Sequence, residues 1–387
     1  MPNGKKEIIM KNTAMKIFSA VLAVVMCSVC FAGCGASTSY TANNTEFFIG
    51  GTGPLTGDAS SYGISVQEGA KLAVKEINAN GGLNGINFKF DIKDDKATAA
   101  DAATGYDTLF EAGMQASIGS VTSGSCDSFA SKADEDGVFA ITPSASAANV
   151  IENRPTVFRV CFGDPDQGVL AAEELTEKYK NIGAIYDTSD AYSSGIFEAF
   201  EAKMKDLGVA FNKQSFDAEN KKDFSTQVEA LKDCDVIFRP IYYTEAGIIA
   251  KTAVAKGCDA VLFGCDGLDG IADQIDETVT NEIKYITPFD VNSPDEKVSS
   301  FVNAYKAEYN KAPDQFAADG YDAIMVIFEA MKKANVTDVT ISAADLGKIL
   351  VSTVTADDFV YVGATGEMTW DTTGACTKVP QIVELGK

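Results

Sequence analysis

The sequence predicts an α/β fold of two doubly wound, Rossmann-like lobes, and three observations support this prediction. Strand-like and helix-like segments alternate from residue 46 to 142 and again from residue 181 to 265. The stretch FRVCFGDPDQG, residues 158–168, separates the two series with an Asp-Pro turn. Most strand-like segments end in loops of small and polar residues, which is where open α/β sheets bind ligands.

The first series begins with the apolar strand FFIGG, residues 47–51. A helix is expected over 61–82, ending at a Gly-Gly pair. Its apolar stripe is predicted to consist of Ile64, Ala70, Val74 and Ile77. The rest of the series is expected to be strands at 86–95, 115–119 and 138–142 and helices at 98–113 and 124–136.

The second series repeats this architecture without repeating the sequence. Its helix after the Asp-Pro turn is expected to have Asp164 as N-cap and Pro165 as first residue. The expected strands are 181–187, 209–216, 234–241 and 259–265, and the expected helices lie near 192–207, 222–233 and 245–256.

The first 33 residues have the pattern of a secretory signal. Four lysines, at positions 5, 6, 11 and 16, precede an apolar run that is too short to span a membrane comfortably. The run ends in FAGCG, which looks like a bacterial lipobox with Cys34 as the lipidated residue; an ordinary signal peptide cut elsewhere is the alternative. Residues 34–45 are typical of a flexible tether. We therefore expect an exported lipoprotein, anchored to the cell membrane on its extracytoplasmic side.

The composition of the remaining 354 residues excludes several function classes. They carry 28 basic and 54 acidic side chains, a net charge of −26, which argues against nucleic acid as a partner. The chain has no histidine, so Ser-His-Asp and Cys-His catalysis are excluded and the commonest zinc ligand is missing. We expect no enzyme, no catalytic residues, no metal and no cofactor.

Two sequence features point to other chemistry only weakly. The glycine-rich stretch GGTGPLTGD has Asp58 where a P-loop needs lysine and Thr56 where GxGxxG needs glycine, so nucleotide binding is not expected. Six cysteines follow Cys34 without a CxxC pair: Cys126, Cys161, Cys234, Cys258, Cys265 and Cys376. A disulfide remains open, with Cys258 and Cys265 as the candidate pair; the alternative is that all six are small buried residues.

The loops at the strand ends carry a family resemblance. The motifs GPLTGDASSYG, IGSVTSGS, ITPSASA, YDTSDAYSSG and KKDFSTQVEALK resemble the solute-binding proteins of branched-chain amino acid ABC transporters, over about residues 46–387. This resemblance implies the type I periplasmic binding protein fold, with two lobes joined by a multi-strand hinge. The N-terminal lobe would hold 44–163 and 289–372, and the C-terminal lobe 164–288 and 373–387.

The resemblance also implies which residues bind a ligand. Ser123 matches the hydroxyl that binds an amino acid's α-carboxylate, a role that suits hydroxyl and helix-start N–H groups. In TPSAS, the Ser144 carbonyl would accept a hydrogen bond from the ligand's ammonium. Ser146 would contact both the carboxylate and the ammonium of the ligand, and Ala145 lies between the two serines. Asp266 matches the acid that pairs with the ammonium, against the alternative of an Asp that only stabilises its own turn.

Aromatic residues complete the implied site. Tyr62, Tyr192 and Tyr242 match tyrosines that line the cleft from both lobes. Phe316 matches an aromatic near the ligand side chain, although core packing is an equal alternative and Tyr321 on the same helix competes with it. Arg239 is left open between a cleft residue that selects the ligand and a salt-bridged one.

The resemblance therefore implies capture of a small, aliphatic amino acid by hinge closure and delivery to ABC permease subunits. A sensor domain of the same fold, feeding a signalling partner, is the alternative. The expected partners are the free amino acid, the permease and the membrane through the lipid anchor only. Leucine, isoleucine, valine, alanine, an amide or an aromatic amino acid all stay open as the ligand.

Overall fold

The computed structural model describes residues 44–385 of the 387-residue chain. The predicted signal sequence, the lipidation site at Cys34 and most of the predicted tether lie outside the described residues. Within them, the predicted α/β fold is confirmed, because two separate sheets are each built by alternating strands and helices. None of the helices in this part of the chain is long and apolar enough to cross a membrane.

The first sheet has five parallel strands in the order β2-β1-β3-β4-β5. Its strands are β1 (Phe47–Gly53), β2 (Phe88–Asp94), β3 (Ala116–Ser117), β4 (Ala140–Thr142) and β5 (Val157–Arg159). The helices between them are α2 (Ser60–Ala79), α3 (Ala99–Glu111) and α4 (Ser123–Glu135), with a short 3-10 turn η1 (Ala148–Val150) before β5. Every residue of β1 is buried, as expected for a parallel strand inside a sheet that helices cover.

The second sheet has six strands in the order β13-β10-β9-β8-β6-β7. They are β6 (Ile182–Asp187), β7 (Asn212–Phe216), β8 (Val236–Arg239), β9 (Val261–Gly264), β10 (Ile283–Thr287) and β13 (Gln381–Glu384). The associated helices are α5 (Asp164–Lys178), α6 (Ala191–Asp206), α7 (Ser225–Leu231) and α8 (Tyr243–Lys256), and the 3-10 turns η2 (Asp266–Leu268) and η3 (Ile271–Asp273) follow β9. All pairings are parallel except that of β13, the last strand in the chain, with β10.

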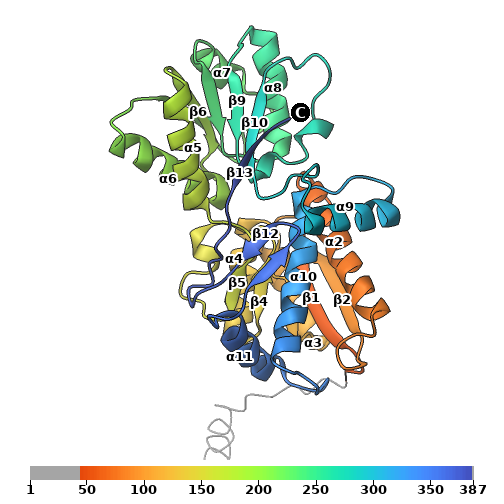
Figure 1. Ribbon diagram of the computed structural model, residues 1–387. Coiled ribbons are helices and arrows are strands. Elements are labelled where there is room, and N and C mark those ends of the chain that lie inside the picture. Colours follow the sequence, from red (N-terminus) through yellow and green to blue (C-terminus); the bar gives the residue numbers. More distant parts are fainter. Residues whose placement is uncertain (1–43, 386–387) are drawn as a thin grey trace, which may run out of the picture. The chain divides into compact units, whose positions relative to one another are not determined.

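The chain returns to the first sheet after β10. There it forms α9 (Glu296–Tyr309), α10 (Gln315–Lys333), α11 (Ala343–Val354) and the hairpin β11 (Tyr361–Gly363) and β12 (Gly366–Met368). Helix α10 can pack closely on α2 because Gly69 has no side chain. A Cβ at this position would lie only 1.8 Å from the Ala317 carbonyl oxygen. We call the first sheet with α2–α4 and α9–α11 the first lobe, and the second sheet with α5–α8 the second lobe (Figure 1).

Three segments connect the two lobes, at 160–163, 288–295 and 369–380. The third segment holds a buried ion pair, in which Lys378 Nζ lies 3.0 Å from Asp319 Oδ1 on α10. Lys378 also donates to Thr365 Oγ1 at 2.7 Å. This cluster ties the last crossing segment to the first lobe.

Two local predictions were wrong. Ile64 is exposed rather than part of the buried face of α2, because it lies on the opposite side from the true stripe of Tyr62, Val66, Ala70, Ala73 and Ile77. The N-cap of α5 is Gly163 and not Asp164. Gly163 has no side chain to cap the helix, and the Asp166 carboxylate instead accepts a hydrogen bond from the Gly163 N–H at 3.0 Å.

Candidate functional site

A small, nearly filled cavity of about 10 Å³, with room for no more than a water molecule, lies where loops of the two lobes meet. Its lining includes seven of the nine residues predicted to bind a ligand: Tyr62, Ser123, Ser144, Tyr192, Tyr242, Asp266 and Phe316. The other two, Ala145 and Ser146, are fully buried but do not line it. The structure thus brings the predicted set to one place, and the three remaining lining residues are Val121, Thr122 and Gly267.

One wall of the cavity is the start of α4. Thr122 is the N-cap and Ser123 the first helical residue, so the unpaired N–H groups of the first turn lie beside the cavity. The Ser123 hydroxyl oxygen accepts a hydrogen bond from the Ala147 N–H at 3.2 Å, which leaves its proton free to donate. The Ser144 hydroxyl donates to the Val121 carbonyl at 2.8 Å and holds the two loops together. This wall can receive a carboxylate without a basic side chain.

Behind this wall, several buried polar atoms lack a partner. The Ser146 hydroxyl is one of them, and both carboxylate oxygens of Asp164 are others. The Ser146 carbonyl accepts hydrogen bonds from Arg159 Nη1 and from the Asp164 N–H. Burial raises the pKa of Asp164 well above its usual range, since desolvation disfavours the charged carboxylate.

The opposite wall is the Asp266 loop of the second lobe. Asp266 Oδ1 accepts two hydrogen bonds, from the Tyr192 hydroxyl at 2.7 Å and from Gln167 Nε2 at 3.0 Å. Burial raises the pKa of Asp266 to about 6, although these two donors oppose the rise. Above that pH the carboxylate is ionised, and it can pair with a cation in the cavity.

Gly267 shapes this wall because of how closely Tyr192 approaches it. A Cβ at Gly267 would lie 2.8 Å from the Tyr192 hydroxyl oxygen, and the Gly267 N–H donates to that oxygen at 2.9 Å. Any larger residue would push Tyr192 away from Asp266.

Tyr62 crosses from the first lobe to the second. Its hydroxyl donates to the Gly267 carbonyl and accepts from the Tyr243 N–H, the latter at 3.1 Å. Its ring lies 4.2 Å from the Phe316 ring, measured between centroids. Burial raises the pKa of Tyr62, so the phenol keeps its proton at neutral pH.

The two candidate aromatics on α10 are distinguished by their surroundings. Phe316 lines the cavity and also packs into the core, so its position is compatible with both interpretations of its sequence position. Tyr321 does not line it; its hydroxyl donates to Glu76 Oε2 at 2.6 Å on another face of the first lobe.

Arg239 fits neither sequence hypothesis. It does not line the cavity, and it makes no salt bridge among the described residues. Instead its side chain is fully buried at the end of β8, where Nη1 donates to the Ala246 carbonyl at 2.9 Å while Nε and Nη2 have no partner. Burial lowers the pKa of its guanidinium to about 9.

The proposed disulfide between Cys258 and Cys265 is also wrong. Both thiols are free, as are the other four cysteines in the described part of the chain. The two residues flank β9 at opposite ends, and an extended strand holds its ends too far apart for an S–S bond. Five of the six thiols are buried, in keeping with the alternative that they act as small core residues.

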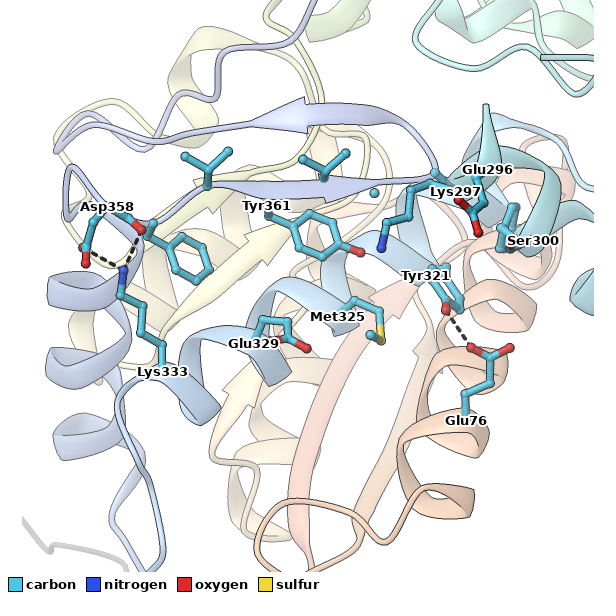
Figure 2. Close-up of a pocket in the computed structure, with 16 residues that line it drawn as sticks. Glu76, Glu296, Lys297, Ser300, Tyr321, Met325, Glu329, Lys333, Asp358 and Tyr361 are labelled. Atoms are coloured by element: carbon cyan, nitrogen blue, oxygen red, sulfur yellow. Dashed lines mark hydrogen bonds and ion pairs between the residues drawn. The ribbon is translucent and has the colours of Figure 1, made fainter. Parts of the chain in front are cut away.

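A larger hollow of about 750 Å³ lies on the first lobe between α9, α10 and β11 (Figure 2). Among its charged side chains, Lys333 pairs with Asp358 at 2.7 Å. Tyr321 and Glu76, which also line the hollow, are hydrogen-bonded to each other. The hollow lacks the convergent hydrogen-bond donors and the single buried acid of the small cavity between the lobes, so we take that cavity as the candidate site.

Besides the lining residues Val121, Thr122 and Gly267, sequence reasoning missed Gln167. It is fully buried on α5 and does not line the cavity, yet it contacts the Asp266 carboxylate directly. The sequence signals were its position near the start of a helix and its place in FRVCFGDPDQG, a motif that also shares the family resemblance.

Comparison with known proteins identifies the family. The family model described as periplasmic binding protein matches residues 46–374, most of the chain. The chain belongs to the periplasmic binding protein family. The resemblance that its loop motifs carry is therefore confirmed.

This periplasmic binding protein is similar to named relatives in sequence and in structure. The Leu/Ile/Val-binding protein BraC3 of Rhizobium johnstonii is 28% identical over 84% of this chain and 90% of that protein. The Leu/Ile/Val/Thr/Ala-binding protein of Pseudomonas aeruginosa is 27% identical over 78% of this chain and 82% of its own length.

Two solved structures support the same placement. The leucine-binding protein LivK of Thermotoga maritima has a TM-score of 0.78 at 26% identity, covering 88% of this periplasmic binding protein and 96% of LivK. The substrate-binding protein LivJ of Streptococcus pneumoniae, solved with isoleucine, has a TM-score of 0.75 at 29% identity, covering 87% and 100%. These relatives are solute-binding proteins.

Proposed function

We propose that this protein is an extracytoplasmic solute-binding lipoprotein that captures a small, aliphatic amino acid and delivers it to an ABC permease. One observation carries the proposal: a single cavity has anion-binding donors of Ser123 and α4 on one wall and the acid Asp266 on the other. A free amino acid carries a carboxylate and an ammonium close together, so its two ends match the two walls.

The polarity of the site supports a zwitterion over a net anion. No lysine or arginine lines the cavity, so a second negative charge on the ligand would find no partner there. The apolar share of the lining comes from Val121, Phe316 and the tyrosine rings, which suits an uncharged side chain. The named relatives bind branched-chain amino acids, threonine and alanine, and they support the same ligand class here.

The proposed mechanism is hinge closure. The first lobe, proposed as 44–163 and 289–372, would bind the carboxylate, and the second, 164–288 and 373–387, would bring Asp266 to the ammonium. A ligand that contacts both lobes favours the closed arrangement over the open one. Lipidation at Cys34 would then keep the protein at the membrane beside the permease. A sensor of the same fold is the second candidate, distinguished by a signalling partner in place of a permease.

The proposal is tested by isothermal titration calorimetry with L-leucine, L-isoleucine, L-valine, L-threonine and L-alanine, each titrated separately into the purified protein. We expect at least one to bind, and Asp266→Asn to weaken it by about 2–5 kcal/mol, the scale of losing a buried charge partner. The α-hydroxy acid analogue of the tightest binder lacks the ammonium, so it should bind the wild type poorly. If the protein bound none of the five, or bound the hydroxy acid equally well, the proposed recognition would be wrong.

A further inference from the structure

We propose that Gln167 is a positioning residue for ligand binding: it orients Asp266 so that Oδ1 is occupied by protein donors and Oδ2 is presented to the ligand. This inference rests on the proposed function, because it concerns how Asp266 meets an ammonium. Gln167 itself does not touch the cavity.

The contact between the two residues is reciprocal. Gln167 Nε2 donates to Asp266 Oδ1 at 3.0 Å, and the Asp266 main-chain N–H donates to Gln167 Oε1 at 3.0 Å. The second bond determines which way the amide faces, since a main-chain N–H can only donate and must meet the amide oxygen. The NH₂ group is therefore directed at the carboxylate.

The two oxygens of Asp266 have different roles as a result. Oδ1 accepts from Gln167 and from the Tyr192 hydroxyl, and these are the two full hydrogen bonds of the carboxylate in the described part of the chain. The main-chain N–H groups of Gly267 and Asp266 also favour its ionised form. Asp266 lines the cavity, so Oδ2 is the oxygen left for the ammonium. Two donors to one oxygen also stabilise the ionised carboxylate, which the ammonium requires.

The position of Gln167 on α5 also connects the two walls of the site. The N–H of Asp164, the first residue of α5, donates to the carbonyl of Ser146, in the loop that follows β4, at 3.0 Å. One helical turn later, Gln167 holds Asp266. The first turn of α5 thus spans from the anion-binding wall to the cation-binding wall, and it begins directly after the first crossing segment.

The electrostatic surroundings make Asp266 dependent on these donors. No cationic side chain forms an ion pair with it in the described chain, burial disfavours its ionised form, and its ionisable neighbours are acids, phenols and a thiol. These neighbours are Asp164 on α5, Asp319 on α10, Tyr62 on α2, Tyr192 on α6, Tyr242 before α8 and Cys265 beside it. Without the Gln167 donor, the pKa of Asp266 should rise above about 6.

The test is Gln167→Met, which keeps an unbranched side chain of similar length but removes both hydrogen bonds. Affinity for each of the five amino acids is measured by calorimetry from pH 6 to 8.5, beside Gln227→Met as the matched control. Gln227 is an amide on α7 that donates to the Ser215 carbonyl away from the cavity. We expect Gln167→Met to weaken binding about 10- to 100-fold at pH 6, the scale of a hydrogen bond to a charged group.

The pH profile separates positioning from a general structural role. A rise of about one unit in the pKa of Asp266 would make the loss about fivefold larger at pH 6 than at pH 8.5, since the carboxylate is ionised in both proteins at the higher pH. Tyr192→Phe removes the other donor to Oδ1 and should show the same slope. Gln167→Leu replaces the methionine variant if that one does not fold.

Two outcomes would overturn the inference alone. One is wild-type affinity in Gln167→Met; the other is a loss of equal size at every pH, which would mean that Gln167 only supports the fold. A wild-type protein that binds none of the five amino acids would instead overturn the proposed function, and this inference with it. The control variant should bind like the wild type throughout.

Discussion

We expect the proposed closure of the two lobes over a ligand to depend on Tyr62, and Tyr62→Phe is the most direct way to test it. The substitution removes one oxygen and keeps the ring that packs at 4.2 Å on Phe316. The lost hydroxyl is the partner of two main-chain groups in the second lobe, the Gly267 carbonyl and the Tyr243 N–H. Both would remain buried and unpaired in the closed arrangement, whereas water can reach them when the lobes part.

The magnitude follows from these two groups. An unpaired buried donor or acceptor costs about 1–3 kcal/mol, so with two such groups the closed arrangement should lose about 2–6 kcal/mol relative to the open one. If the ligand binds tightly only to the closed form, affinity falls by the same free energy, about 30- to 20,000-fold. The dissociation constant is measured by calorimetry, and closure by the radius of gyration in small-angle X-ray scattering with and without saturating amino acid.

Tyr321→Phe is the matched control. Its hydroxyl donates a partly buried hydrogen bond to Glu76 Oε2 at 2.6 Å, on the face of the first lobe shown in Figure 2 and away from the cavity. This variant should bind and close like the wild type. The reasoning would be refuted if Tyr62→Phe bound every amino acid with wild-type affinity and contracted as fully on binding. Tyr62 would then be a core residue with no part in closure.

Three further predictions concern other buried groups. Ser146→Ala should change the free energy of unfolding only slightly without ligand, because its hydroxyl makes no full hydrogen bond and only its interaction with the buried Asp164 carboxylate is lost. It should weaken amino acid binding by about 1–3 kcal/mol in calorimetry, and wild-type affinity would exclude Ser146 as a ligand partner. Lys378→Met should cost about 3–5 kcal/mol of unfolding free energy in urea denaturation, since it leaves Asp319 buried without its cation; an unchanged midpoint would contradict this. Burial and the Asp314 carboxylate raise the pKa of Asp269 to about 7, so the folded protein binds a proton that the unfolded chain releases near pH 4. Stability should therefore fall as pH rises from about 4 to about 7, and Asp269→Asn should flatten this decline in urea melts across that range.

The parts of the site that the sequence revealed are those that lie at strand ends. Ser144 and Asp266 lie two residues after buried strands, and Ser123 begins the helix after the loop that follows β3, so the parallel topology brings these segments to the same edges of the sheets. Phe316 was found through the family resemblance, and its alternative as a core residue turned out to be compatible with lining the cavity.

The features that the sequence did not reveal depend on distances between segments far apart in the chain. Gln167 and Asp266 are 99 residues apart, and no local pattern indicates that an amide on one helix meets an acid after a later strand. Arg239 was misread for a similar reason: its position at a strand end suggested the cleft, but its side chain lies in the interior with only a carbonyl partner. The error at Ile64 arose because a few apolar residues can match a helical period without sharing its buried side.

Three hydrogen bonds between the lobes have a consequence for how the ligand selectivity of such a protein can change. Tyr62, Thr244 and the Gln315 amide nitrogen each reach across the cleft to a main-chain oxygen, of Gly267, Asp58 and Asp266 respectively. Peptide oxygens are the same whatever residue carries them. Replacing lining residues other than Tyr62 should therefore change selectivity while these three hydrogen bonds keep their acceptors.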